Sequence, residues 1–445
     1  MQSLFYFLLA LALLIIIHEY GHFWVARRCG VKVLRFSVGF GKPLWRKVGK
    51  DGTEYVLAPI PLGGYVKMLD EREADVAEHE KAQAFNRQSL SKRTAIVAAG
   101  PIANLSFAVL AYWVLFVTGI PGLKPVIAEI EVDSPAMVAG LVQGDEIISI
   151  DGQNTPTWNA VIKAMVPHIQ DGSAIAIGTK SEFDETRLIM NLPKLDLTQQ
   201  RDLLTLLGIT PLIPDFAPII GQVVDGGAAD SAGIKSGDRV ISADGQAIQT
   251  WRSWVAFIQA RPGQPISVSI ERDGLVKEVV LEPELTEDGK GRIGAGVDSD
   301  DVDFPEALQA EVHYGPLTAV KEAIQQTWLF SSTTLTSLWG MLTGQVSTEN
   351  LGGPISIAQM AGSSAEQGYI SFISFLAMIS ITLGILNLLP IPMLDGGHLV
   401  MFLVEAVTGK PVPDHLQIKG QQIGLFILLT LMFIAFYNDL SRLFG

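Results

Sequence analysis

The sequence predicts a polytopic α-helical membrane protein with four transmembrane helices, a membrane-associated β-sheet and two tandem α+β domains. Three observations point to this class. Of the 445 residues, 48% are hydrophobic and only 18% are charged, which is too apolar for a soluble enzyme of this length. Long apolar stretches are separated by polar segments. Between the second and third stretches, one pattern of small and acidic residues occurs twice.

The first apolar stretch, roughly residues 4–26, has Glu19 as its only charged side chain and ends at Arg27 and Arg28. It lacks a basic segment before the apolar run and a clear cleavage site, so we interpret it as a retained anchor. Arginines suit the cytoplasmic headgroup layer, which places the N-terminus outside.

Charge is unevenly distributed along the chain. Residues 27–93 contain fourteen Lys and Arg against eight Asp and Glu, a net charge of +6, whereas residues 119–315 contain fourteen against thirty, a net charge of −16. The positive-inside rule then predicts a cytoplasmic first block and an external second block. The overall net charge of −14 argues against nucleic acid as a partner. The single cysteine, Cys29, excludes an internal disulfide.

The sequence HEYGH at residues 18–22 closes the first stretch. On a helix, His18 and His22 share one face, so two neutral imidazole nitrogens can bind one zinc ion. Glu19 beside them can take a proton from an attacking water. A chance match on an ordinary helix is the alternative. Because an ionisable residue at membrane depth costs about 2.5–3.5 kcal/mol, three together favour the metal site.

Residues 31–69 predict β structure, with strands at 31–38, 55–61 and 65–69 and glycine-rich breaks at 39–41 and 63–64. Either this is a soluble sheet packed on a core, or it dips into the membrane and offers an edge to an extended peptide. The charged segment 70–93 is expected to be helical or irregular. The second span, residues 95–118, contains Asn104, for which we favour a hydrogen bond between helices.

The repeat runs from 133–158 and again from 226–251. Gly140 and Gly233, Asp145 and Asp238, and Trp158 and Trp251 are each 93 residues apart; this shared offset indicates a duplicated domain. The pattern of a small-residue helix, a Gly-Asp turn and a strand ending in Asp-Gly resembles bacterial PDZ domains. Such a fold can bind extended chains or carboxyl termini by β-augmentation. Alternatively, its groove is vestigial and the domain only occupies space. Both alternatives remain open for each copy.

The last third of the chain predicts two further spans, at 369–393 and 423–437, and a loop at 361–368. A third zinc ligand is needed, and Asp395 is the best candidate because Pro390 and Pro392 unwind the helix just before it. His398 is a competing ligand, with a cap or loop role as its alternative. Asp395 reaches the depth of the histidines only if residues 324–342 do not span, so both termini are expected outside.

HEYGH, the Gly100-Pro101…Asn104 helix, the N-x-x-P-x-x-x-x-D-G segment and an inserted PDZ pair resemble the site-2 protease family of intramembrane zinc metalloproteases. The stretches HFWVARRCGV, GTEYV, IPLGGYVKMLDER and LDGGHL extend the resemblance over the whole chain. It implies that one zinc ion per chain is bound by His18, His22 and Asp395, with Glu19 as the catalytic base. It further implies a set of substrate-holding residues: Asn387 and, in membrane-reentrant strands, Gly39, Gly41, Gly63, Gly64 and Tyr65.

The resemblance implies hydrolysis of peptide bonds within the transmembrane segments of single-span proteins, namely an anti-sigma factor trimmed beforehand on the outer side and remnant signal peptides. The expected location is the bacterial inner membrane, with periplasmic PDZ domains and the zinc site near the cytoplasmic side. Partners would be these segments, the lipid bilayer and peptide ligands of the PDZ domains. The alternatives are a catalytically inactive zinc-binding scaffold with PDZ domains, and a metal transporter.

The expected segments are the first transmembrane helix with HExxH (1–27), the reentrant sheet and loop on the cytoplasmic side (28–94), the second transmembrane helix (95–118), the first PDZ domain (119–211), the second PDZ domain (212–303), an amphipathic membrane-surface region (304–368), the third transmembrane helix with the LDG motif (369–398), and a loop with the fourth transmembrane helix (399–445).

Overall fold

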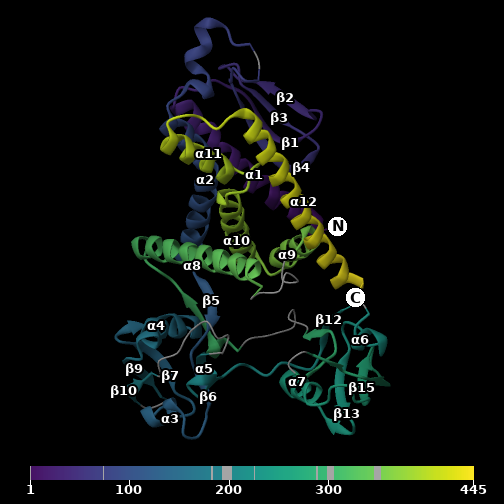
Figure 1. Cartoon of the computed structure of the whole chain (residues 1–445). Coiled ribbons are helices and arrows are strands. Elements are labelled where there is room, and N and C mark those ends of the chain that lie inside the picture. The colour runs from purple at the N-terminus through teal and green to yellow at the C-terminus, as the bar shows by residue number, and fades with distance from the viewer. Residues whose placement is uncertain are drawn as a thin grey trace. The chain divides into compact units, whose positions relative to one another are not determined.

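The computed structural model describes residues 2–73, 75–181, 184–192, 203–224, 226–286, 289–297, 305–344 and 352–444. The chain folds into two compact units. The first is formed by the residues up to Thr118 together with those from His313 to Leu440, and the second by Gly119–Val312. Long helices dominate the first unit, and two small strand-rich modules make up the second (Figure 1).

Four helices among the described residues are long and apolar enough to cross a membrane, as the sequence predicts. They are α1 (Gln2–Arg28), α2 (Leu90–Thr118), α10 (Tyr369–Leu388) and α12 (Asp414–Phe444). The helix that contains residues 324–342, α8 (Pro316–Leu342), is not one of the four. The remaining helices of the unit are α9 (Pro354–Glu366) and α11 (Asp395–Thr408), with 3-10 turns at Glu78–Gln83 and Phe85–Arg87.

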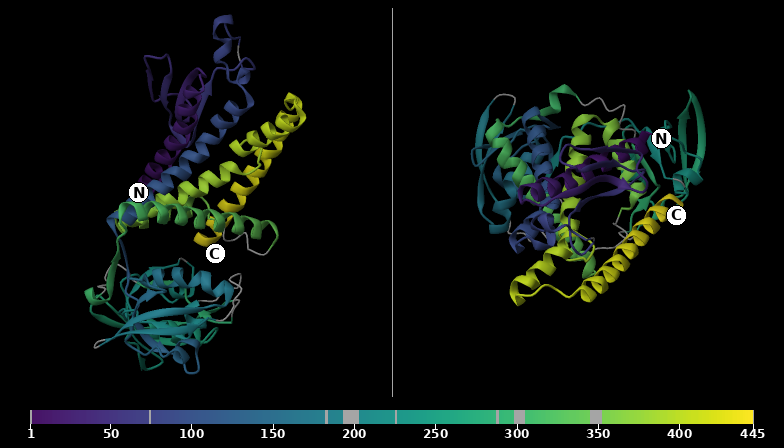
Figure 2. Two further views of the ribbon diagram at one scale, coloured as in Figure 1. Left: turned by 90° about the vertical axis from the view of Figure 1, so that its left-hand side faces the viewer. Right: turned by 90° about the horizontal axis from the view of Figure 1, so that it is seen from above.

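The helices α1, α2 and α10 lie close together (Figure 2), and small residues allow this approach. A Cβ on Gly21 of α1 would lie 2.3 Å from the carbonyl oxygen of Ala99 in α2, and one on Gly384 of α10 would lie 3.2 Å from another carbonyl oxygen of α2. Ser380 of α10 donates a 2.8 Å hydrogen bond to the backbone carbonyl of Asn104. Transmembrane helices approach through contacts of this kind. As a result, α2 contacts both α1 and α10.

A four-stranded sheet follows α1, with strand order β2-β3-β1-β4. Its strands are β1 (Val33–Phe40), β2 (Trp45–Val48), β3 (Glu54–Leu57) and β4 (Ile60–Met68). β1 pairs in parallel with β3 and antiparallel with β4. In the described part of the chain, β4 therefore forms one edge of the sheet.

The expected strand break at Gly63 and Gly64 is wrong, because both glycines lie inside β4. Gly64 pairs with Val38 of β1, and a Cβ on Gly64 would lie 2.7 Å from Cγ of Glu19. The glycine is needed for the approach of the strand to α1, not for a turn. The expected break after Val38 appears as a register shift, and β1 continues to Phe40.

The expected loop at 361–368 is also wrong, because most of it belongs to α9. The helix begins at Pro354, and its N-terminus is capped by a carboxylate from α12. Gly353 and Ile355 donate backbone hydrogen bonds of 2.9 and 2.8 Å to Asp439, which is 1% exposed. Because this cap comes from a distant helix, the one local start signal in the sequence was Pro354 at the first helical position. The cap also fixes the end of α12 to α9.

The second unit contains two copies of one arrangement. The first copy comprises β6 (Ile127–Ile130), α3 (Pro135–Ala139), β7 (Glu146–Ile150), β8 (Gln153–Asn154), α4 (Trp158–Asp171), β9 (Ala174–Lys180), β10 (Glu185–Asn191), α5 (Leu203–Leu206) and β11 (Ile209–Pro211). The second comprises β12 (Ile220–Val223), α6 (Ala228–Ser231), β13 (Arg239–Ala243), β14 (Gln246–Ala247), α7 (Trp251–Gln259), β15 (Ile266–Arg272), β16 (Leu275–Leu281), β17 (Glu284–Leu285), β18 (Gly291–Arg292) and β19 (Ala295–Val297). A 3-10 turn, Glu306–Leu308, precedes β20 (Gln309–Val312), which pairs with β5 (Ile120–Leu123).

The two copies share strand order and turn geometry. Their sheets run β8-β7-β9-β10 and β14-β13-β15-β16, and in each copy the first strand pairs with the last. Asp151 and Asp244 occupy equivalent turns with φ of 49° and 47°. The cores differ at the repeated tryptophan: Trp158 is buried in the first copy, whereas in the second Trp254 is buried and Trp251 only partly so. The boundary expected at 303/304 lies outside the described residues.

Candidate metal centre

Three side chains from opposite ends of the chain converge inside the first unit. Nε2 of His18 and Nε2 of His22 lie 3.2 and 3.4 Å from Oδ2 of Asp395, and 3.2 Å from each other. They are the one group of three or more potential metal ligands found within 4.8 Å of one another among the described residues. Their side chains are 11–18% exposed.

The spacing of these atoms fits a tetrahedral zinc ion. Two ligands bound at about 2.0–2.1 Å in tetrahedral geometry lie about 3.3 Å apart, and the three observed separations are 3.2, 3.2 and 3.4 Å. Two imidazoles and one carboxylate form a donor set typical of catalytic zinc, which leaves a fourth position open. The residues present therefore fit a single zinc ion.

The orientation of His22 is fixed by α2. Its Nδ1 lies 2.8 Å from the backbone carbonyl oxygen of Ile96, so Nδ1 carries the proton and donates it there. Nε2 then presents its lone pair to the ligand cluster. A hydrogen bond of this kind is what orients a metal-binding histidine.

Glu19 lies beside the histidines on α1 and is 8% exposed. Its side chain faces Gly64 of β4, where any Cβ would lie 2.7 Å from the Glu19 Cγ. The missing side chain thus makes room for the carboxylate between helix and sheet. A carboxylate at this position can accept a proton from a molecule in the open position of the cluster.

Asp395 reaches the histidines through a sharp turn after α10. Met393 in this turn has a φ of 97°, in the left-handed region that non-glycine residues rarely adopt. A Cβ on Gly396 would lie 2.1 Å from the carbonyl oxygen of Leu389. This glycine lets α11 begin directly against the turn, which directs Asp395 toward α1.

The other predicted residues near this turn lie outside the cluster. Asn387 lies in the last turn of α10 and is half-buried. His398 lies in the first turn of α11 and is not a member of the described ligand group. Of the two competing candidates for the third ligand, the geometry therefore favours Asp395.

The predicted sheet residues lie at two places. Gly39 and Gly41 have φ of 89° and 105° and lie at the end of β1. Gly63 and Tyr65 flank Gly64 in β4, whose outer edge has no partner strand among the described residues. The structure brings the β4 group, through Gly64, beside α1.

Two features of the centre were not identified from the sequence. A Cβ on Gly100 of α2 would lie 2.3 Å from Nε2 of His22, so the glycine makes room for the imidazoles. Arg93 in the first turns of α2 forms a 2.5 Å ion pair with Glu405 of α11. The sequence pattern marked Gly100 only as a small residue suited to helix contact, and it gave no signal for the ion pair.

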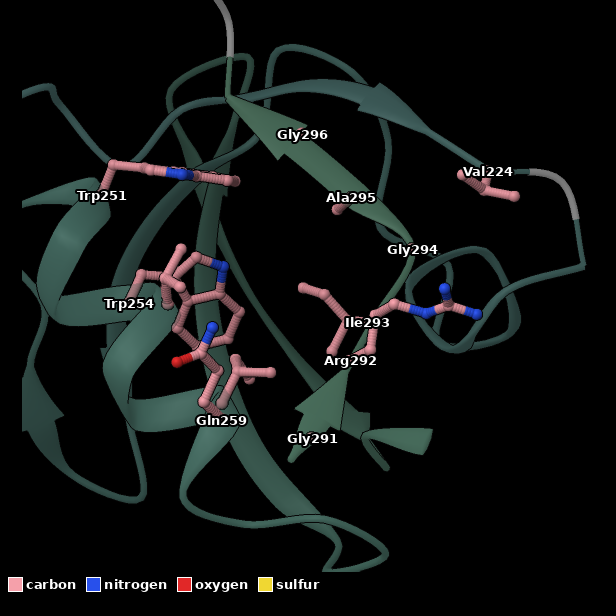
Figure 3. A pocket seen from close by; sticks show the side chains of 12 residues that line it. Val224, Trp251, Trp254, Gln259, Gly291, Arg292, Ile293, Gly294, Ala295 and Gly296 are labelled. Carbon is pink, nitrogen blue, oxygen red and sulfur yellow. The ribbon is translucent and has the colours of Figure 1, made fainter. Parts of the chain in front are cut away.

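A separate groove lies in the second copy of the repeat (Figure 3). It has a volume of about 370 Å³ and lies between Trp251 and Trp254 of α7 and the segment Gly291–Gly296, which contains β18 and the start of β19. A smaller pocket of about 180 Å³ lies next to Trp158 of the first copy.

Comparison with known proteins identifies the family. The model of Peptidase family M50 matches residues 6–431. The regulator of sigma-E protease RseP of Salmonella typhimurium is 44% identical over 98% of both chains, its namesake in Escherichia coli K12 is 43% identical over 98% of both, and protease RseP of Yersinia pestis is 43% identical over 99% of both.

Among solved structures, the PDZ domain of the SdrC-like protein of Listeria monocytogenes aligns with 20% of this chain and 96% of its own. The identity is 16% and the TM-score is 0.18, too low to support a statement about the fold. The family match and the full-length relatives are sufficient without it. The chain therefore belongs to Peptidase family M50 and is an integral membrane metalloprotease.

Proposed function

We propose that this chain is an intramembrane zinc metalloendopeptidase of the site-2 protease type, with one zinc ion held by His18, His22 and Asp395. The observation that carries the proposal is the convergence of three ligand atoms 3.2–3.4 Å apart within a bundle of apolar helices. Charged and titratable groups at that depth are costly, and the cost is offset where they bind an ion and perform chemistry.

The chain's own residues account for proton transfer. When bound, zinc supplies Lewis-acid chemistry, polarising the substrate carbonyl and promoting deprotonation of water. Glu19 accepts the proton from the attacking water as the new C–O bond forms. It then gives that proton to the amine nitrogen as the C–N bond breaks, so the carboxylate is regenerated. His18, His22 and Asp395 serve as ligands throughout.

Substrate must be presented as an extended strand, because a helix hides its own carbonyl groups. The open edge of β4 beside Glu19 can pair with such a strand. In this proposal, Gly63, Gly64 and Tyr65 hold the strand from one side. Asn387, at the end of α10, holds its backbone from the other. Gly39 and Gly41 shape the end of the sheet, which dips into the membrane.

The proposed topology places the metal near the cytoplasmic side of the bacterial inner membrane. It is supported by Arg27 and Arg28 at the end of α1 and by the charge difference between residues 27–93 and 119–315. The duplicated unit is then a periplasmic tandem PDZ pair. α8 lies on the membrane surface with Trp328 and Trp339 exposed.

The proposed substrates are single-span membrane proteins. The relatives are named for regulation of sigma-E, which points to an anti-sigma factor of an envelope stress response, and remnant signal peptides form a second class. The PDZ pair would exclude substrates with bulky outer domains until another protease trims them. Its grooves would bind peptide ligands by strand addition.

The test uses the purified full-length chain, reconstituted in liposomes with a single-span substrate. We expect zinc bound at one ion per chain, and cleavage within the transmembrane segment that is lost on chelation and restored by zinc. Glu19→Gln should retain the metal and lose cleavage by at least a factor of about 100. Glu366→Gln, an exposed substitution at the end of α9, should behave as the unsubstituted chain.

If the chain is instead an inactive zinc-binding scaffold, the opposite result is expected. A zinc-loaded chain that binds the substrate without cutting it, and whose Glu19→Gln variant is indistinguishable from it, would support the scaffold and refute the protease.

A further inference from the structure

The two histidines of the metal centre differ in what holds their second nitrogen. His22 donates from Nδ1 to the backbone of Ile96. His18 has Nδ1 3.5 Å from the side-chain amide nitrogen of Asn104, a residue that is 0% exposed. The amide nitrogen of Asn104 and Nδ1 of His18 face each other across this contact, an arrangement that is incompatible with zinc binding by Nε2 of His18. An amide NH₂ can only donate, and Nδ1 would then have to accept.

The zinc site requires the other proton arrangement. If Nε2 of His18 gives its lone pair to the metal, the proton of the neutral ring lies on Nδ1. Nδ1–H needs an acceptor, and the side-chain oxygen of Asn104 is the nearby candidate. That oxygen, Oδ1, is buried and has no hydrogen-bond partner among the described residues. The O and N of an amide are assigned from their hydrogen bonds and not from their shape.

We propose that Asn104 is a positioning residue for the metal, turned so that Oδ1 accepts the Nδ1–H of His18. This inference rests on the proposed zinc site. Turning the amide by 180° gives Oδ1 a hydrogen-bond partner and leaves Nδ2 without one, so the number of hydrogen bonds does not change. The orientation of the Asn104 amide is therefore decided by the position of the proton on His18. Asn104 thereby fixes the ring tautomer that leaves Nε2 free to bind.

The register of the two helices supports this role. Ile96, Gly100 and Asn104 are spaced by four residues and therefore lie along one face of α2. His18 and His22 have the same spacing on α1. Each histidine thus meets an acceptor of α2, with Gly100 between them, where any Cβ would lie 2.3 Å from Nε2 of one ring and 2.8 Å from Cε1 of the other. One helix face therefore serves both ligands.

The decisive property is acceptance of a hydrogen bond, which side-chain exchange can isolate. Asn104→Asp keeps the shape and, in its ionised form, can only accept a hydrogen bond. Asn104→Leu keeps similar bulk and can neither accept nor donate. Ser380→Ala is the matched control, because it removes another buried hydrogen bond to the same residue, the one to its backbone carbonyl, and leaves the acceptor in place.

The experiment measures the zinc affinity of the full-length chain in detergent by competition with a metal chelator, using Zn²⁺ alone as the probe. We expect Asn104→Leu to weaken binding about 10- to 100-fold, the usual effect of removing such a partner. Asn104→Asp and Ser380→Ala should stay within about threefold of the unsubstituted chain. The visible spectrum of Co²⁺-loaded chains should change for Asn104→Leu and be restored in Asn104→Asp.

Two outcomes would overturn the inference: zinc affinity of Asn104→Leu equal to that of the unsubstituted chain, or an equal loss in Asn104→Leu and Asn104→Asp. Far-UV circular dichroism of each variant checks that the helices form. If the Leu variant does not fold, Asn104→Ala, which also lacks an acceptor and adds no bulk, carries the result: it should bind zinc about 10- to 100-fold more weakly, and an affinity equal to that of Ser380→Ala would overturn the inference. An unsubstituted chain that takes up no zinc would instead refute the proposed metal site itself.

Discussion

Buried polar side chains around the candidate metal centre differ from those of the duplicated unit in what satisfies them. Near that centre, Glu19, His22 and Asn104 are buried among apolar helices, and both His22 and Asn104 contact His18. In the duplicated unit, the buried carboxylates Asp145 and Asp238 each accept a backbone N–H from three residues earlier in their own turn. The first set is arranged around a space for a ligand, and the second around the chain itself.

This difference separates two kinds of consequence. Because a buried polar group without a partner is costly, each group must be satisfied by something. Where the partner is an ion, substitution should cost metal binding and activity while the fold persists. Where the partner is the chain, substitution should cost stability while the metal stays. Each of the following substitutions or conditions tests this distinction between effects on metal binding and effects on stability.

Asp395→Ala should have the largest effect. It removes the one carboxylate among the three ligands, and we expect zinc affinity to fall by more than about 1,000-fold with complete loss of cleavage. Metal content after dialysis measures the first effect. The thermal unfolding of the duplicated unit, followed by tryptophan fluorescence, should not change. A shift in that transition would contradict the division between the units.

Asp238→Asn should give the converse result. Asp238 pairs with Arg272 through two 2.6 Å hydrogen bonds, and its side chain is fully buried. Leaving Arg272 without its partner should destabilise the duplicated unit by about 3 kcal/mol, roughly a hundredfold in its unfolding equilibrium. Asp145→Asn is the matched change, since the strand position equivalent to Arg272 is the neutral Ser181. It should cost less, and zinc content should be unaltered in both.

The contribution of the Asp238–Arg272 ion pair to stability should be lost at low pH. Burial alone would raise the pKa of Asp238, but hydrogen bonds from Arg272 and the Lys235 backbone outweigh it and hold the pKa below its usual range. The pair's contribution is therefore complete above about pH 3.9, the unfolded value, and is lost as pH falls through the lower folded pKa. In denaturant titrations below pH 4, stability should fall more steeply in the unsubstituted chain than in Asp238→Asn.

Gly100→Ala tests packing at the metal instead of a ligand. The added Cβ would lie 2.3 Å from Nε2 of His22, so the ring or the helix must shift. We expect zinc affinity to fall about tenfold with no change in ligand identity. Gly315→Ala is the control, because nothing lies within 4 Å of its Cβ position. Equal zinc affinities in Gly100→Ala and Gly315→Ala would show that the helices move apart without displacing the metal ligands.

Local patterns predicted much of this arrangement. The i, i+4 histidines, the apolar stretches and the 93-residue offset are each visible within a short segment or by simple alignment. What could not be predicted depends on partners distant in sequence. Residues 361–366 were taken for part of a loop, whereas they belong to α9, a helix whose cap, Asp439, comes from another helix. Gly64 was taken for part of a strand break because the neighbour that requires a glycine there, Glu19, lies on α1.

The ion pair of Arg93 and Glu405 gives the smallest predicted effect. It joins the start of α2 to α11, whose first residue is Asp395, and both side chains are mostly buried. Arg93→Met or Glu405→Gln should therefore weaken zinc binding about threefold, less than loss of a direct partner of a ligand. Arg87→Met, which breaks the exposed pair with Glu71, should have no effect.

A double-mutant cycle decides whether this pair acts on the metal through α11. The reversed pair, Arg93→Glu with Glu405→Arg, should recover part of the affinity that either reversal alone removes. Losses that simply add would mean that the two side chains contribute separately. In that case, the position of Asp395 would be set by the turn at Met393 and Gly396 alone, and polar contacts away from the cluster in the helical unit would serve the fold, as they do in the duplicated unit.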